Sequence, residues 1–304
     1  MVGANFQGLL NRAHYTRFGL PVQPSVTGNA PWWLWPTILS LDAPIVVVLW
    51  QRLIGAAASA PAGTPEMAVL GCSVWLAYSA DRWIEGWRLD PETIGTHRHQ
   101  FYQRMRWQVA ALWAAVLALD VTVALRWLPS TEFLAGLLVL VPVAAYLLSH
   151  QLVHRNSRWR LPKELCVALL LGAGAAVFSV GRQGVRLAPI AEPLGLFVLL
   201  CFSNCTLISV WEHEIDRIHG QTSLSHQFAG ARALAHLLPW VIAAVSALAW
   251  TSGGRGTAAA CAAVSAVLLG LVDLAEKRTG RMPARVMADV ALLTPLVPVV
   301  WGHA

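Results

Sequence analysis

Long apolar stretches recur along the whole chain and alternate with short segments rich in charged residues, proline and glycine. Most stretches approach the roughly 20 apolar residues that a helix needs to cross the hydrocarbon core of a bilayer. The pattern predicts an all-α integral membrane protein with about nine transmembrane helices. The predicted spans are 32–53, 64–81, 107–127, 132–150, 163–181, 189–210, 232–252, 257–275 and 284–303. We therefore expect an N-terminal arm at 1–30 and a single transmembrane helical domain at 31–304.

Lysine and arginine are divided unevenly between the two sides that these spans define. Most of the 22 lie in the N-terminal arm and in the loops that follow even-numbered spans. Cytoplasmic segments collect lysine and arginine, so we expect the arm and these loops to be cytoplasmic. An odd number of spans then places the C-terminus on the other side of the membrane.

Composition excludes a soluble domain with a single anchor. Hydrophobic residues make up 56% of the chain and charged residues 12%, against about 25% charged residues in soluble domains. The net charge of +6 fits arginines beside lipid headgroups, so we expect membrane lipids as partners and no nucleic acid. The first 30 residues lack the apolar core of a cleaved signal peptide. They also lack a transit-like leader, which is compatible with the expected bacterial inner (plasma) membrane.

Two predicted cytoplasmic loops carry paired acids. Asp81 and Glu85 follow the second span, and Glu212 and Asp216 follow the sixth. Residues four apart share one face of a continuing helix. Such carboxylates bind Mg²⁺ together with substrate phosphates, or they are solvated helix ends that form surface ion pairs. Two matching pairs on one side of the membrane favour the magnesium site.

The second acid pair belongs to a longer pattern. Its motif reads Glu212-xxx-Asp216-Arg217-xx-Gly220-xx-Ser223-Leu224. This sequence resembles the DxxxDRxxGxxSL motif of the UbiA superfamily of intramembrane prenyltransferases, with glutamate at the first aspartate. The family's first motif, NDxxDxxxD, is half present: Asp81 and Glu85 match its last two acids, while Ala77 and Tyr78 stand at the Asn-Asp positions.

The resemblance implies a fold, an activity and a set of site residues. It implies a nine-helix bundle that moves a prenyl group from a prenyl diphosphate to a hydrophobic or aromatic, membrane-soluble acceptor, with Mg²⁺ as cofactor. The implied catalytic and metal-binding residues are Asp81, Glu85, Glu212 and Asp216. The implied diphosphate contacts are Arg82, Arg217 and Lys163, which is similar to a diphosphate-contacting lysine of the family. The missing Asn-Asp half puts full metal binding in doubt.

Three further residues are candidate substrate contacts. Tyr78 lies on nearly the same helix face as Asp81 and is either a donor to a phosphate oxygen or an interfacial anchor. Arg98 belongs to the run His97-Arg98-His99 and is expected to reach the diphosphate. Asn204 precedes Glu212 by about two helical turns and is expected to line the same cavity.

Other polar and aromatic residues have two interpretations each. Intramembrane acids either face a polar cavity or form interhelical hydrogen bonds, and these are Asp42, Asp120, Asp273 and Asp289. Asp42 is followed by Pro44, where a broken helix would open a pocket. Three tryptophans near the motifs either shield a prenyl cation or simply pack, and these are Trp83, Trp87 and Trp211.

Two other function classes compete with prenyl transfer. One is a catalytically altered UbiA-like protein that binds a lipid, quinone or pigment, or serves as a subunit or scaffold; the incomplete first motif favours it. The other is secondary transport, which intramembrane aspartates would suit, although the sequence shows no convincing repeat with paired broken helices.

Overall fold

The computed structural model describes residues 30–88, 96–149, 162–214, 223–252 and 256–301, and all regular structure within these ranges is helical. Six single helices are long and apolar enough to cross a membrane. They are α5 (Arg106–Trp127), α6 (Ser130–Leu148), α7 (Lys163–Gly181), α8 (Ala188–Trp211), α11 (Ala231–Thr251) and α12 (Gly256–Thr279). The predicted all-α integral membrane protein is confirmed.

The first predicted span is a bent pair of helices. A short 3-10 turn, η1 (Trp32–Leu34), leads into α1 (Trp35–Ile38), and α2 (Asp42–Ala57) follows at an angle of 73°. Ser40 at the break has a positive φ of 56°, and its hydroxyl lies 3.1 Å from the hydroxyl of Tyr102. Pro44 falls in the first turn of α2, where its missing N–H costs nothing. The helix break predicted near Asp42 is therefore present.

Two other predicted spans coincide with helices that fall short of these criteria for a span. One is α3 (Thr64–Arg88), which extends beyond its predicted end at 81 and carries charged residues near both ends. The other is divided into α13 (Arg281–Ala291) and α14 (Leu296–Val300). Pro295 cannot donate to a continuing helix, and the Thr294 hydroxyl donates instead to the Cys261 carbonyl at 3.0 Å. In the described ranges, nine continuous spans are not confirmed.

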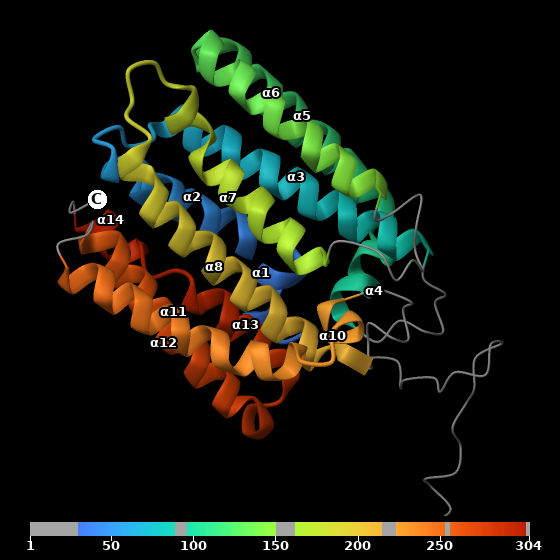
Figure 1. Ribbon diagram of the computed structural model, residues 1–304. Helices are drawn as coiled ribbons and strands as arrows, with labels where there is room; N and C mark the ends of the chain where they lie inside the picture. The colour runs from blue at the N-terminus through green and yellow to red at the C-terminus, as the bar shows by residue number, and fades with distance from the viewer. Residues whose placement is uncertain (1–29, 89–95, 150–161, 215–222, 253–255, 302–304) are drawn as a thin grey trace, which may run out of the picture.

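The long helices form one bundle in which α2, α7 and α8 lie toward the centre (Figure 1). Trp50 of α2 is fully buried, stacks on Phe197 of α8 at 5.1 Å, and donates its indole N–H to the Leu292 carbonyl at 3.0 Å. That bond ties the break after α13 to the core. Gly172 lets α7 approach α8 closely, since a Cβ there would meet Val198 at 2.3 Å.

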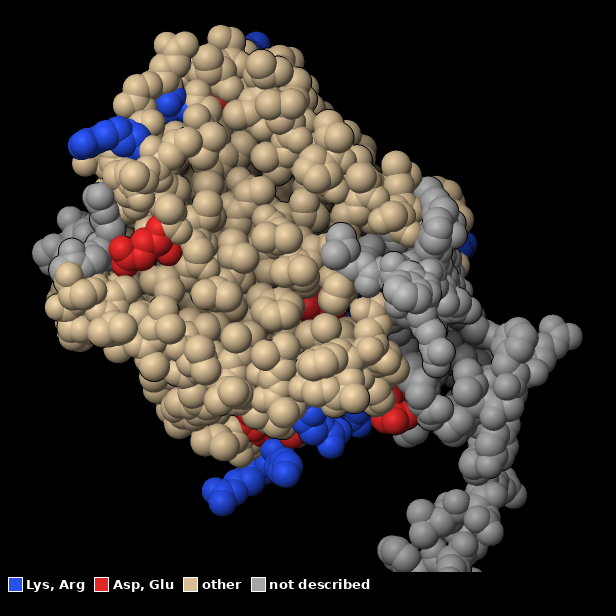
Figure 2. Space-filling model, in the orientation of Figure 1, with Lys and Arg blue, Asp and Glu red and all other residues tan. Residues whose placement is uncertain are grey.

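The outer surface is apolar, as a lipid-facing surface must be. Figure 2 shows charged side chains mainly toward the two ends of the molecule, with a broad uncharged surface between them. Helices α5 and α6 bury little of their apolar side chains inside the molecule. Such exposure would be unfavourable in water but is expected in a bilayer.

An ion cluster joins three helices at the end of the bundle opposite the acid pairs. Arg182, which follows α7, donates to Glu66 of α3 at 2.8 Å and to Glu132 of α6 at 3.1 Å. Each glutamate lies in the first turn of its helix, where a negative charge is favourable to the helix dipole. The cluster fixes this end of the bundle.

Candidate functional site

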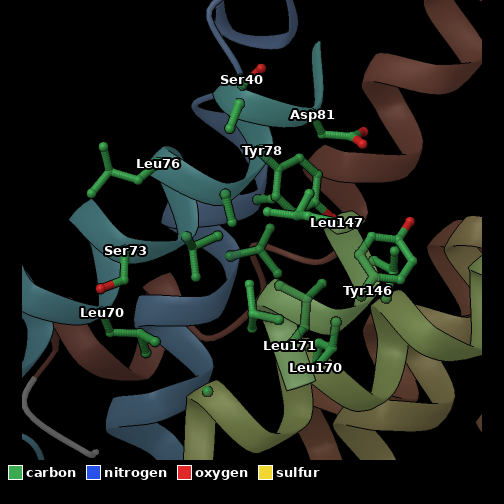
Figure 3. A pocket seen from close by; sticks show the side chains of 18 of the residues that line it. Ser40, Leu70, Ser73, Leu76, Tyr78, Asp81, Tyr146, Leu147, Leu170 and Leu171 are labelled. Carbon is green, nitrogen blue, oxygen red and sulfur yellow. The ribbon is translucent and has the colours of Figure 1, made fainter. Parts of the chain in front are cut away.

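A cavity of about 720 Å³ enters the bundle beside the acid pairs. Residues of α1, α2, α3, α5, α6, α7, α8 and α13 line it, together with Arg98 of α4 (His97–Arg104). Figure 3 places polar residues toward one end of the view, Ser40, Tyr78 and Asp81, and leucines toward the other, Leu70, Leu170 and Leu171. The cavity is therefore amphipathic, with a charged end and an apolar arm.

The apolar arm lies between two pairs of packed helices. Helix α5 packs on α3 and α6 packs on α7, while α5 and α6 have few contacts with each other. Both helices contribute apolar side chains to the lining, including Leu117, Val121, Leu137, Leu140 and Val143. A space of this composition suits a long hydrocarbon group.

The first acid pair sits on the last turns of α3, where the helix continues as predicted. Arg82 donates to Glu85 at 3.1 Å and lies 3.8 Å from Asp81. His99 is buried, and its Nε2 lies 3.0 Å from the Glu85 carboxylate. The Thr96 hydroxyl lies 2.7 Å from Nδ1 of the same ring, so Nε2–H donating to Glu85 satisfies both ring nitrogens.

Glu212 follows α8 and lies between two arginines from other helices. Arg285 of α13 donates to it at 2.5 Å, and Arg98 of α4 (His97–Arg104) lies 3.8 Å away. Helix α4 lies at the same end of the bundle as α10 (Leu224–Gln227), as Figure 1 shows. Arg98 thus reaches the site, and it connects the loop after α3 to the end of α8.

Arginine side chains hold these carboxylates in their ionised form. Burial opposes ionisation of Glu212, yet Arg285 and Arg98 hold its pKa at about 2. Arg82 and His99 similarly hold the pKa of Glu85 well below its usual range against the effect of burial. Burial, with Arg285 and Arg82 nearby, lowers the pKa of Arg98 to about 9. Because its surroundings disfavour the charged form of Arg98, an anion that binds beside it would be stabilised.

Helix α7 begins at the same end and brings two adjacent charged residues. Lys163 lines the cavity, as expected for a diphosphate contact. Glu164 is buried, and both of its oxygens accept from the Leu224 backbone N–H at 3.1 Å. Ser223 and Leu224, the described end of the second motif, are thus held against α7.

Tyr78 and Asn204 both line the cavity. Tyr78 is partly buried and lies toward the same end as Asp81 in Figure 3, and Tyr146 of α6 also belongs to the lining. Asn204 is buried and donates to Asp289 of α13 at 2.9 Å. Asp42 is hydrogen-bonded to Asp289 as well.

The intramembrane acids separate into two groups. Asp42, Asp120 and Asp289 line the cavity, whereas Asp273 lies outside its lining. Asp273 instead accepts from Trp211 at 3.2 Å and lies 2.6 Å from His236, which links α8, α11 and α12. Asp273 therefore forms interhelical hydrogen bonds, which was the second of the two interpretations.

Among the described residues that line the cavity, none is Trp83, Trp87 or Trp211. Trp83 donates to the Arg106 carbonyl, and Trp87 packs against Trp83 at 5.4 Å. Their contacts favour the packing interpretation. Aromatic rings that do border the cavity belong to Tyr78, Trp113, Phe133, Tyr146 and Phe178.

Two members of the second motif, Asp216 and Arg217, lie outside the described residues. Among the described residues, histidine, cysteine and acid side chains form no group of three fit for a metal ion. Glu85 and Glu212 are both bonded to cationic or imidazole groups instead. The predicted magnesium site, which includes Asp216, stays a prediction.

Sequence analysis missed three residues of this site: Glu164, Arg285 and Tyr146. Glu164 directly follows the predicted diphosphate contact Lys163, and Arg285 lies one helical turn before Asp289. These positions in the sequence could have pointed to Glu164 and Arg285. Tyr146 lies in an apolar stretch like many others, and only packing brings it to the cavity.

The fold of the chain is that of a solved structure, the apo form of a UbiA homolog from Aeropyrum pernix K1. The TM-score is 0.59 at 17% sequence identity, and the match covers 87% of this chain and 99% of that one. No protein-family model matches the sequence, and no curated protein matches it. The likeness establishes the fold, and the predicted UbiA-like bundle is confirmed.

Proposed function

On the premise that this chain has the fold of a UbiA homolog, we propose that it is an intramembrane prenyltransferase. It binds a prenyl diphosphate in the amphipathic cavity and transfers the prenyl group to a membrane-soluble acceptor. The site opens to the cytoplasmic side of a bacterial inner membrane, as the distribution of lysine and arginine predicts.

The observation that carries this proposal is the pairing of a basic end with an apolar arm in one cavity. The basic end, which is the charged end of the cavity, is lined by four cationic side chains, Arg82, Arg98, Lys163 and Arg285, beside the carboxylates of Asp81, Glu85, Glu164 and Glu212. A diphosphate is the anionic group that such a set recognises, because guanidinium groups donate paired hydrogen bonds to phosphate oxygens. A prenyl chain then fills the apolar arm.

The same residues supply the chemistry of ionisation. As the bond between C1 of the prenyl group and the diphosphate oxygen breaks, negative charge accumulates on the leaving group. The guanidinium donors stabilise that charge in a site with little water. The negative faces of Tyr78 and Tyr146 border the space where the allylic cation forms, and the apolar walls exclude water that would quench it.

No step is assigned to a metal, because the described carboxylates are bonded to arginine and histidine side chains. We propose that Arg82, Arg98 and Arg285 exchange these carboxylates for the diphosphate when it binds. Arg217 and Asp216, outside the described residues, remain predicted members of the same site.

The test is binding of geranylgeranyl diphosphate to the purified protein, with either Mg²⁺ or EDTA present. We expect binding in EDTA that Arg98→Gln weakens and that Arg278→Gln leaves unchanged. Arg278 is the matched control because it is an exposed arginine in the last turn of α12, outside the cavity lining. Binding that requires Mg²⁺ and that Asp81→Asn and Asp216→Asn both abolish would establish the magnesium site instead. No binding in either condition would exclude the transferase.

A binding protein without catalysis is the second candidate. Glu85 and Glu212 are both bonded to arginine or histidine side chains, so neither carboxylate is available to a metal ion as it stands. This observation favours the binding protein. Release of pyrophosphate from bound geranylgeranyl diphosphate separates the two. Binding with no release in the presence of membrane lipids would support the binding protein.

A further inference from the structure

Three polar side chains from distant parts of the chain meet in the cavity wall. Asp42 begins α2 just after the helix break, Asn204 lies in α8, and Asp289 lies in α13. Asn204 donates its amide to Asp289 at 2.9 Å, and Asp289 is also hydrogen-bonded to Asp42. The three helices are thus joined by an acid pair and an amide that face the cavity.

Most of the polar atoms of this cluster that can take a further hydrogen bond are acceptor oxygens. A bond between two carboxyl groups needs one proton, so Asp42 and Asp289 together keep one negative charge and several free lone pairs. Asn204 is 7% exposed, and its Oδ1 has no hydrogen-bond partner among the described residues. A buried carbonyl oxygen without a donor is costly, so a donor placed beside this oxygen would be stabilising.

The cluster also disfavours an anionic ligand. Arg285 lies one turn before Asp289 on α13, but it donates to Glu212 at 2.5 Å. A carboxylate or phosphate placed against Asp42 and Asp289 would be repelled by their negative charge, and the only donors it would meet at the cluster are the shared proton and the second N–H of Asn204. The complementary group is neutral and carries a hydroxyl.

The cluster lies deeper in the bundle than the basic end of the cavity. Asn204 precedes Glu212 by eight residues and Asp289 follows Arg285 by four, so the cluster lies roughly 6 to 12 Å deeper along the helices. A group held there faces the first carbon of a prenyl chain whose diphosphate occupies the basic end.

We propose that Asp42, Asn204 and Asp289 form the acceptor subsite and select a neutral hydroxyl-bearing acceptor. The inference rests on the proposed prenyl transfer. The acceptor oxygen forms a bond to C1 of the prenyl group while the bond from C1 to the diphosphate breaks. The hydroxyl proton passes to the carboxylate of the acid pair, and the diphosphate leaves with the electron pair. The product is an ether.

The test uses two acceptor probes that differ in a single group. Both 1,2-decanediol and 2-hydroxydecanoate have the same chain and the same secondary hydroxyl, but the acid carries a carboxylate in place of the terminal alcohol. The full-length protein is supplied with geranylgeranyl diphosphate, and ether formation is measured by mass spectrometry. We expect ether from the diol at least tenfold faster than from the acid. No ether from the diol, or equal rates from both, would overturn the inference.

Variants separate this subsite from the diphosphate site. Asp289→Asn and Asn204→Leu should slow ether formation, the first by about 100-fold as expected for loss of a general base. Binding of geranylgeranyl diphosphate should stay within twofold, which also shows that the variants are folded. Asp273→Asn, another buried aspartate but outside the cavity lining, is the matched control and should leave the rate unchanged.

The two proposals fail in different ways. If wild-type protein does not bind geranylgeranyl diphosphate, prenyl transfer itself fails. If it binds and forms ether but Asp289→Asn is as fast as the wild type, the acid pair is not the proton acceptor, and the subsite inference alone is wrong.

Discussion

At the scale of single residues, Arg285 is the arginine with the shortest contact to an acid of the site. It donates to Glu212 at 2.5 Å and lines the cavity beside Arg98. We expect Arg285→Gln to weaken binding of geranylgeranyl diphosphate by at least tenfold, because hydrogen bonds to charged groups contribute about 1.5–3 kcal/mol. Isothermal titration calorimetry in detergent measures the change. An affinity equal to that of Arg278→Gln would show that Arg285 only supports Glu212.

His99 predicts how stability depends on pH. Burial, with a contribution from Arg98, lowers the pKa of His99 to about 4 from 6.5, although its hydrogen bond to Glu85 opposes this. Between these pH values the unfolded chain binds a proton that the folded chain excludes, so stability falls as pH falls through this window. The loss amounts to roughly 3 kcal/mol. Thermal unfolding followed by tryptophan fluorescence in detergent should show it.

A variant isolates the contribution of this imidazole. His99→Gln keeps a donor toward Glu85 but cannot titrate, so its melting temperature should change little between pH 6.5 and 4.5. Below that range the acids contribute, since the pKa of Glu212 lies at about 2 and its stabilising charge is lost as pH falls toward that value. Equal pH slopes in wild type and variant would contradict the assignment.

At the scale of elements, α6 sets the width of the apolar arm. Gly136 lines the cavity, and a Cβ there would find only Phe178 at 4.0 Å, so a larger side chain has space to project into the arm. We expect Gly136→Leu to reduce affinity for geranylgeranyl diphosphate by about tenfold while geranyl diphosphate binds as before, because only the longer chain fills that space. Competition binding between the two diphosphates gives the ratio.

A control for this change is available on α8. Gly195 also has nothing within 4 Å of a Cβ, but it lies outside the cavity lining. Gly195→Leu should leave the preference between the two diphosphates unaltered. If Gly136→Leu weakens both diphosphates equally, the arm does not hold the prenyl chain.

At the scale of the whole molecule, orientation is a prediction that follows from charge alone. The distribution of lysine and arginine places the N-terminus and the acid pairs in the cytoplasm and the C-terminus outside. In a bacterial host, green fluorescent protein fused to the N-terminus should fluoresce, and alkaline phosphatase fused to the C-terminus should be active. An inactive phosphatase at the C-terminus would show that the number of spans is even or that the orientation is reversed.

The hydrophobic pattern predicts where the spans lie but not whether each span is one continuous helix. The predicted ranges all coincide with helices, but the first and last are broken: Ser40 has a positive φ at the first break, and Pro295, which has no N–H, stands at the last. Sequence flagged the first break through Asp42 and Pro44. Pro295 was the corresponding signal in the last span, and the prediction of a continuous span did not use it.

The sequence by itself determined the helical membrane bundle, the approximate helix ranges and the acid pair of α3, because bilayer thickness and helical periodicity act along the chain. It also identified Arg98, Lys163 and Asn204 as candidates near one cavity. Only the tertiary structure decided which charges meet. Arg285 reaches Glu212 and Asp42 reaches Asp289 across long separations in sequence, and the cavity lining does not include Trp83, Trp87 or Trp211. These contacts depend on how the helices pack against one another, which the local sequence pattern does not specify.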